Sequence, residues 1–423
     1  MEKKEKSGLK RFLKVLGPGF ISGASDDDPA CIGTYAKAGA ILGYMFLWVP
    51  LLILPLMIVT QFICAKIGMI SGRGLAGNIR RHFPRAVLYP AVLGLAAANT
   101  IEAGADLGAM AAAINLVIPL PIPALTVALA LIILLFQFVT QYRQLKKVFK
   151  WATLALFAYI GAGLLSKPDL TEVVRATFVP TVNFDITFFS LLVALLGASF
   201  SPYIFFWLTS QEVEEERAKG HDHRKQLNAN RKEMKYLKVD VGVGMLFANL
   251  ITYFVLLSTA ATLFKHGSTD ISSAVEAARA LEPIAGEWAG WLWALGLLGV
   301  GFLAVPVLTG SAAYALSEAF RLPHGLNERP VNAKGFYASI TISTIIGVAI
   351  NFFGINPIHA LFVVELINGI LAPPLLLLIL IMANNREVMG NKVNGRLSNI
   401  FGGVATAAMF AAAFGMILLW FKS

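Results

Sequence analysis

Charged side chains are scarce in this sequence, and their scarcity excludes most soluble folds. Only 14% of the 423 residues are Asp, Glu, Lys or Arg, whereas 57% are hydrophobic. Soluble domains usually carry about 25% charged residues and about 45–50% apolar ones. Cysteine is also rare: Cys31 and Cys64 both fall within apolar stretches, so we expect no disulfide framework. Phosphate-binding loops, metal-hydrolase spacings and nucleophile–base pairs are missing too, so we expect neither an enzyme nor a bound cofactor.

The sequence consists mainly of long hydrophobic runs. Runs of about 18 or more apolar residues recur along the chain, and each can cross a hydrocarbon core of about 30 Å. We therefore predict an all-α polytopic protein in a lipid bilayer, with about 11 transmembrane helices. The predicted spans are residues 12–41, 43–68, 86–117, 122–141, 148–166, 186–209, 238–264, 288–319, 335–354, 357–382 and 399–421.

Positive charge is concentrated between alternate spans. Most of the 35 lysines and arginines lie in residues 3–14, 66–85, 143–150, 217–238, 321–334 and 386–396. The positive-inside rule then places the N-terminus in the cytoplasm and, with an odd number of spans, the C-terminus outside a plasma (inner) membrane. Topology thus accounts for the net charge of +10, and no nucleic-acid partner is expected.

The one long polar stretch, residues 210–238, is predicted to be a charged cytoplasmic connection, helical in character. Its sequence His-Asp-His at 221–223 is read as solvated side chains in preference to a metal site.

Two stretches in different halves of the chain resemble each other. GASDDDPACIGTY (23–35) lies in the first span and GASFSPYIFFW (197–207) in the sixth, each with a proline in mid-span. Proline removes a backbone donor and breaks a helix, and unwound backbone is tolerated in a membrane only where it is buried or lines a cavity. Five spans separate the two stretches, which predicts an inverted repeat of residues 12–166 (helices 1–5) and 186–382 (helices 6–10), followed by an extra helix at 399–421.

Three consecutive acids, Asp26, Asp27 and Asp28, adjoin the first break. A carboxylate at membrane depth costs at least about 2.5–3.5 kcal/mol, so its presence needs a reason. We predict that Asp28 binds a metal ion, whereas Asp26 and Asp27 either cap a half-helix or face a water-filled vestibule. Gly23 and Gly197 are read as hinges or, equally, as points of close helix packing.

In these features the chain resembles the NRAMP divalent-metal transporters, over nearly its whole length. That family has an amino-acid-transporter-like fold with broken helices 1 and 6. Its first break reads Asp-Pro-Gly-Asn, where this chain has Asp28-Pro29-Ala30-Cys31, and its second reads Ala-x-x-Met-Pro-His, where this chain has Ala198 to Tyr203. The resemblance implies that the ion ligands stand at Asp28, Cys31, Ala198 (through its carbonyl) and Ser201.

The departures from the family pattern are informative. Ser201 replaces a methionine, and a hydroxyl suits hard ions such as Mg²⁺ whereas a thioether favours transition metals. Mg²⁺ also keeps several waters, for which the smaller serine leaves room. The pattern resembles the NRAMP-related magnesium transporters. If Cys31 contacts the ion, it favours transition metals over Mg²⁺, because a thiol is a soft ligand; alternatively, Cys31 is only a small buried residue.

A further acid, Glu365, stands in the tenth span where the family usually has a glutamine. We expect it to line or close the ion site. The other reading is a protonated Glu365 that forms a hydrogen bond between helices, and Asn368, three residues on, is compatible with either.

Most residues of the family's proton path are replaced in this sequence. Where the family has a histidine after the sixth-span proline, this chain has Tyr203. Of the family's two acids on the third span, the first is kept as Asp106 and the second is replaced by Ala109. Glu102, one turn earlier on the same face, could substitute for the lost acid. The ninth span carries only Lys334, at its mouth. The sequence therefore favours transport of Mg²⁺, and also Mn²⁺, by alternating access without proton coupling.

Three alternatives stay open. A proton-coupled Mn²⁺ or Fe²⁺ importer with altered ligands is the nearest. An organic-solute transporter is disfavoured because acids at the break would repel a substrate carboxylate. A non-transporting scaffold has no need for paired broken helices with acids inside the membrane.

Overall fold

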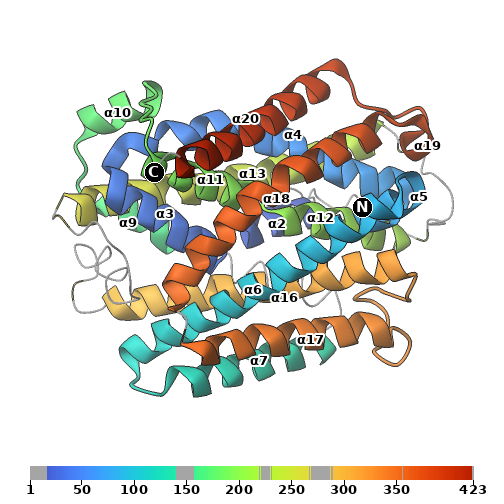
Figure 1. The fold of residues 1–423 in the computed structure, drawn as a ribbon, viewed down its shortest axis with the longest axis horizontal. Coiled ribbons are helices and arrows are strands. Elements are labelled where there is room, and N and C mark those ends of the chain that lie inside the picture. The colour runs from blue at the N-terminus through green and yellow to red at the C-terminus, as the bar shows by residue number, and fades with distance from the viewer. Residues whose placement is uncertain are drawn as a thin grey trace, which may run out of the picture.

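The computed structural model describes residues 17–139, 157–218, 231–265, 289–354 and 356–421, together with residues 220, 229, 267 and 286. This part of the chain is helical, with no strand (Figure 1). Its helices are α2 (Pro18–Asp26), α3 (Pro29–Leu42), η1 (Gly43–Phe46), α4 (Trp48–Ser71), α5 (Leu75–His82), α6 (Arg85–Val117), α7 (Ile122–Val139), α9 (Phe157–Leu165), α10 (Leu170–Phe178), α11 (Ile186–Ser199), α12 (Pro202–Ala218), α13 (Arg231–Thr259), η3 (Ala260–Phe264), α16 (Ala289–Phe320), α17 (Lys334–Ile350), η5 (Asn351–Phe353), α18 (Pro357–Asn384), α19 (Arg386–Met389) and α20 (Arg396–Trp420).

The predicted all-α membrane architecture is confirmed. Within the described residues, 9 helices are long and apolar enough to span a membrane. The first predicted span is present as two shorter helices, α2 and α3. The fifth is described only from residue 157 onward, as α9.

The helices around the polar stretch 210–238 run further than the predicted spans. That stretch was predicted to be helical in character, and two helices extend into it: α12 continues from the sixth span to Ala218, and α13 begins at Arg231, before the seventh span. No glycine or proline interrupts residues 203–218 or 231–238, so charge alone does not end either helix. Residues 221–223, with the two histidines, lie outside the described residues.

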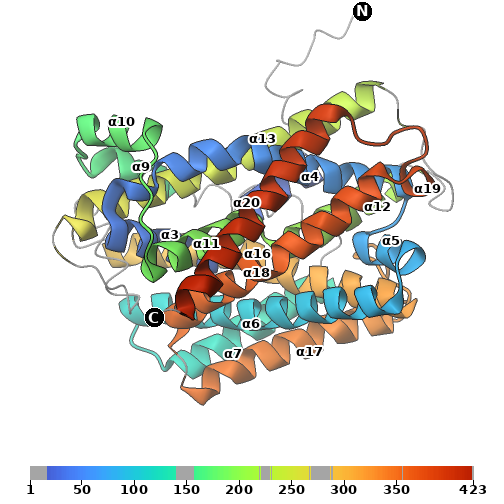
Figure 2. The same cartoon turned by 45° about the horizontal axis from the view of Figure 1, so that its top comes forward.

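The helices form a bundle with two distinct ends. Helices α5 and α19 lie at one end, whereas α10 and the C-terminal end of α20 lie at the other, in both views (Figures 1 and 2). Helix α6 packs along α16, and α7 and α17 lie side by side at the edge of the bundle (Figures 1 and 2). The broken helices are enclosed by this arrangement: α2 packs on α13, and α11 packs on α18.

Both predicted breaks are present. Helix α2 ends at Asp26 and α3 starts at Pro29, while α11 ends at Ser199 and α12 starts at Pro202. Proline fits the first turn of a helix, because backbone N–H groups there have no acceptor within the helix and a missing one costs no hydrogen bond. Each proline therefore starts the second half-helix. Each break therefore leaves two helix ends inside the membrane region of the fold.

Half-helix α2 is fixed to α13 at its beginning and along its length. The Asp240 carboxylate accepts hydrogen bonds from the backbone N–H groups of Gly17 (2.6 Å), Gly19 (2.8 Å) and Phe20 (3.2 Å). One turn further, Gly23 lies directly against the backbone of Gly244. This contact supports the packing interpretation of Gly23, and its role as a hinge stays a prediction.

Replacing Gly23 by alanine is expected to destabilise the fold. The added Cβ would overlap the backbone of Gly244, which cannot move like a side chain, and such overpacking typically costs about 1–3 kcal/mol. Gly242 on α13 is the matched control, because a Cβ there meets no atom within 4 Å. We expect a lower thermal unfolding midpoint for Gly23→Ala in detergent and an unchanged or higher one for Gly242→Ala. Equal midpoints for the two variants would contradict this packing.

Candidate metal site at the helix breaks

The three acids of the first break occupy three different positions. Asp26 is the last residue of α2, Asp27 follows it in the break, and Asp28 is the N-cap of α3. The Asp28 Oδ1 atom accepts a hydrogen bond from the Cys31 backbone N–H at 2.7 Å, as an N-cap carboxylate should. All three side chains are at least 98% buried. The cap fixes Asp28 at the start of α3 and directs it into the break.

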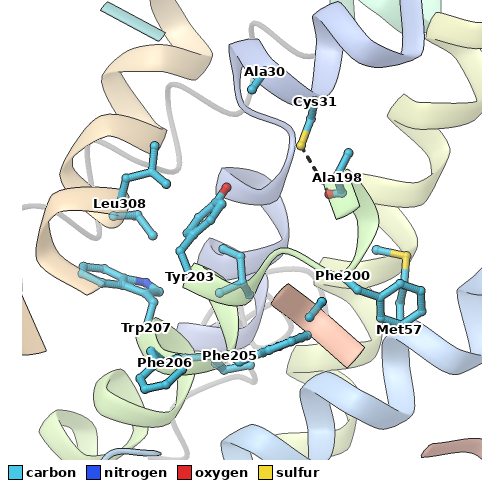
Figure 3. Packing of buried hydrophobic residues seen from close by; sticks show 14 of the residues in the cluster. Ala30, Cys31, Met57, Ala198, Phe200, Tyr203, Phe205, Phe206, Trp207 and Leu308 are labelled. Carbon is cyan, nitrogen blue, oxygen red and sulfur yellow. Dashed lines mark hydrogen bonds between the residues drawn. The ribbon is translucent and has the colours of Figure 1, made fainter. Parts of the chain in front are cut away.

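The second break brings a backbone carbonyl to the same place. The Ala198 carbonyl accepts hydrogen bonds from the Ser201 hydroxyl (2.9 Å) and from the Cys31 thiol (3.3 Å). Figure 3 shows the Cys31 sulfur directed from the first broken helix toward Ala198 on the second. The four positions implied by the family resemblance, Asp28, Cys31, Ala198 and Ser201, are therefore joined by direct contacts.

Glu365 completes this group from α18. Its Oε1 atom lies 3.4 Å from the Cys31 sulfur. One ligand atom each from Asp28, Cys31 and Glu365 all lie within 4.8 Å of one another, and all three side chains are buried. Two carboxylates and one sulfur so close together, beside a carbonyl oxygen, can hold a divalent cation. The predicted position of Glu365 at the site is consistent with this geometry.

Asn368 links Glu365 to a third helix. Its Nδ2 group donates to Glu365 Oε2 (3.3 Å) and to Glu102 Oε2 on α6 (3.0 Å). The sequence placed Asn368 on the same face as Glu365, but its bond to Glu102 depends on how α18 is rotated toward α6. Because the Asn368 amide is the donor in both bonds, neither Glu102 nor Glu365 has to be protonated to form them.

Tyr203, at the position of the family's histidine, contacts the first break. Its hydroxyl donates to the Ser25 carbonyl (2.7 Å) and to Asp28 Oδ2 (3.1 Å). Figure 3 shows this hydroxyl directed from α12 toward the broken helix. Tyr203 therefore positions Asp28.

The remaining predicted residues lie around this centre. Asp106 Oδ1 accepts a hydrogen bond from the Ala30 N–H at 3.2 Å, so it contacts the first turn of α3. Asp26 lies beside the Ser201 hydroxyl. Asp27 is buried in the break, close to Asp26 and Asp28.

The centre is strongly acidic. Within the described residues, no lysine or arginine forms an ion pair with any of its buried carboxylates: Asp26, Asp27, Asp28, Glu102, Asp106 and Glu365. Buried charges are normally paired or coordinate metal ions. A bound divalent cation would supply the positive charge that the described lysines and arginines do not.

Replacing Asn368 by alanine is expected to weaken cation binding. It removes a donor shared by two carboxylates, and hydrogen bonds to charged groups contribute about 1.5–3 kcal/mol. Glu365 then loses its fixed position, so KM for Mn²⁺ uptake should rise about tenfold, at about 1.4 kcal/mol per tenfold change. Asn384→Ala is the control, because Asn384 lies on the same helix but is exposed and bonds to Asn399. An unchanged KM for Asn368→Ala would show that Glu365 does not need this anchor.

Known proteins resemble the chain over most of its length. It is 28% identical to a protein named divalent metal cation transporter MntH from Caldanaerobacter subterraneus, covering 97% of this chain and 92% of that protein. A protein of the same name from Klebsiella pneumoniae is 26% identical, over 95% of this chain and 93% of that protein.

Solved structures agree on the fold. The Eremococcus coleocola manganese transporter superposes with a TM-score of 0.74 at 18% identity, over 99% of this chain and 88% of that one. MHP1, a nucleobase-cation-symport-1 family transporter, superposes with a TM-score of 0.62 at 15% identity, over 96% and 90%. Residues 19–419 match the family described as natural resistance-associated macrophage protein-like, and the chain belongs to this Nramp family.

Proposed function

We propose that this protein carries divalent metal cations across the membrane, Mg²⁺ foremost and Mn²⁺ as well, by alternating access and without proton coupling. The observation that carries the proposal is the buried group of Asp28, Cys31 and Glu365, whose ligand atoms lie within 4.8 Å of one another. Relatives named divalent metal cation transporters support the general activity. A partly hydrated ion would be held between the two breaks.

In this mechanism Asp28 and Glu365 supply the charge, and Ala198 and Ser201 supply a carbonyl and a hydroxyl. Oxygen ligands of this kind suit Mg²⁺, which needs only one or two carboxylates and retains water. Residues 12–166 and 186–382 are the two repeats that would move relative to each other, with the N-terminus in the cytoplasm and the C-terminus outside. Plasma-membrane potential alone supplies about 4.6 kcal/mol per divalent ion at 100 mV.

The absence of coupling is inferred from the residues that would carry protons. Tyr203 donates both to Asp28 and to the Ser25 carbonyl, so its hydroxyl serves as a structural donor. Ala109 cannot titrate, and α17 carries no basic residue beyond Lys334 at its start. Among the described residues, the positions of the family's histidine and of its second third-span acid therefore carry no group that exchanges protons near neutral pH.

A proton-coupled Mn²⁺ transporter is the second candidate, and one observation favours it. The Cys31 sulfur lies inside the candidate site, and sulfur ligands select transition metals over Mg²⁺. Under this reading Glu102 and Asp106 would carry the protons.

Flux into liposomes decides between the two. Purified protein is reconstituted with a Mg²⁺-sensitive dye inside, and a pH-sensitive dye is used in a parallel preparation. Mg²⁺ entry without acidification supports the uncoupled magnesium carrier. Mn²⁺ entry with acidification and without a Mg²⁺ signal supports the second candidate, and no entry of either ion contradicts both.

A further inference from the structure

Helix α4 carries a buried lysine, Lys66, near the end of the helix at Ser71. Lys66 is only 6% exposed. Its Nζ atom donates to the Val393 carbonyl (3.2 Å) and to Asn394 Oδ1 (3.3 Å), both in the connection between α19 and α20. An ammonium group has three N–H donors, so one remains for a further ligand. Lysine is almost never buried without a charged partner, and both of these acceptors are uncharged.

Two further lysines reach Lys66 from other elements. Lys238, on α13, has its Nζ atom 5.3 Å from the centroid of the Phe62 ring, and Phe62 stands one turn before Lys66 on α4. Lys392 belongs to the connection between α19 and α20. Both charges are near enough to repel that of Lys66. Within the described part of the chain, no carboxylate forms an ion pair with any lysine of this cluster (Lys66, Lys238 and Lys392).

Asn394 adds an open hydrogen-bond donor to the lysine cluster. It is 9% exposed, and its Nδ2 group has no hydrogen-bond partner among the described residues, while its Oδ1 atom accepts from Lys66. Its backbone N–H donates to the Ala383 carbonyl at 3.0 Å, which fixes its position. The next residue, Gly395, is the N-cap of α20 and supplies no side-chain cap. Buried donors and helix N-termini are both satisfied by an anion, as is a cluster of lysines.

The surroundings of the lysine cluster favour a lipid headgroup over a soluble anion. Leu397, Ile400 and Val404 on α20 are exposed, and their spacing of three and four residues places them on one face of the helix. This apolar stripe begins three residues after Asn394, and an exposed apolar face in a membrane protein contacts acyl chains. The predicted orientation places all three lysines on the cytoplasmic side, where anionic lipids attract basic residues.

We propose that Lys66, Lys238, Lys392 and Asn394 bind the phosphate group of an anionic phospholipid in the cytoplasmic leaflet. Lys66 and Asn394 supply the buried donors, and the other two lysines supply charge at the rim. Helix α4 packs against α13, α19 and α20, so the bound lipid joins the elements that meet around α4 (Figures 1 and 2). The inference goes beyond the proposed function, and its test measures binding without an ion gradient.

The test titrates the delipidated, full-length protein in detergent with phosphatidylglycerol and counts bound lipid by native mass spectrometry. We expect wild-type protein to bind phosphatidylglycerol at least about tenfold more tightly than phosphatidylcholine, whose phosphate is neutralised by its own choline. Inorganic phosphate at an equal concentration should not displace the lipid, because it lacks acyl chains. A tenfold difference in affinity is equivalent to about 1.4 kcal/mol.

Two variants test the assigned residues. Lys392→Gln removes one charge from a partly exposed side chain, so the fold should be retained. Asn394→Asp keeps an oxygen for Lys66 but replaces the open donor with a negative charge. Each should lower the affinity for phosphatidylglycerol about tenfold. Lys334→Gln is the matched control, because it removes the same charge from an exposed lysine at the start of α17, and the affinity should not change.

Three results would overturn the inference. Equal affinity for the two lipids would show that the cluster does not select negative charge. Displacement of phosphatidylglycerol by an equal concentration of inorganic phosphate would make this a site for a soluble anion. Wild-type affinity in both Lys392→Gln and Asn394→Asp would place the lipid elsewhere. Failure of the proposed function looks different, since liposomes would show no ion entry while lipid binding stayed as expected.

Discussion

Asp28→Asn is expected to lower the uptake of Mg²⁺ and Mn²⁺ at least about a hundredfold, because truncating one partner of a buried charge pair costs about 2–5 kcal/mol. The asparagine keeps a side-chain oxygen for the Cys31 N–H, and asparagine is as good an N-cap as aspartate. Helix α3 should therefore start as before, and the loss should come from the missing charge. Dye flux into liposomes measures the effect directly.

Asp28→Ala separates the two roles of this residue. It removes both the charge and the cap, and loss of an N-cap costs about 1 kcal/mol of stability. We expect equal loss of uptake in both variants but a lower unfolding midpoint only in the alanine variant. Asp169→Asn is the matched control: Asp169 caps α10 in the same way but is exposed, so uptake should not change. Uptake near the wild-type rate in Asp28→Asn would place the transported ion elsewhere.

The sequence was sufficient to predict the helices and the breaks, because both follow from local pattern. Apolar runs determine which segments can span a membrane, and Pro29 and Pro202 determine where two of them restart. Helices α12 and α13 extend into the charged stretch 210–238, which was predicted to be helical, because a helix continues through charged residues until a breaker occurs.

Contacts between helices were less accessible to prediction. The resemblance to a family placed Asp28, Cys31, Ala198 and Ser201 together, but the bond of Asn368 to Glu102 and those of Tyr203 to Ser25 and Asp28 depend on helix rotation.

Ser201→Met is expected to change which ion is preferred. A thioether is a soft ligand and binds Mn²⁺ better than Mg²⁺, whereas the serine hydroxyl is hard. The serine is fully buried and lies at the second break, where its hydroxyl bonds the Ala198 carbonyl. The longer side chain would take space that hydration water of Mg²⁺ needs. We expect the ratio of Mn²⁺ to Mg²⁺ uptake to rise about tenfold or more, equivalent to about 1.4 kcal/mol.

Ser201→Ala distinguishes the effect of the added sulfur on the uptake ratio from the effect of the lost hydroxyl. Both variants free the Ala198 carbonyl from its bond to Ser201, but only methionine adds a soft ligand. Overpacking by methionine can cost about 1–3 kcal/mol of stability, and because both ions are measured on the same liposomes this cost cancels in the ratio. A ratio that rises only in Ser201→Met assigns selectivity to the ligand at this position. Equal ratios in the two variants would mean that the acids Asp28 and Glu365 set the preference for the ion, and that residue 201 only shapes the break.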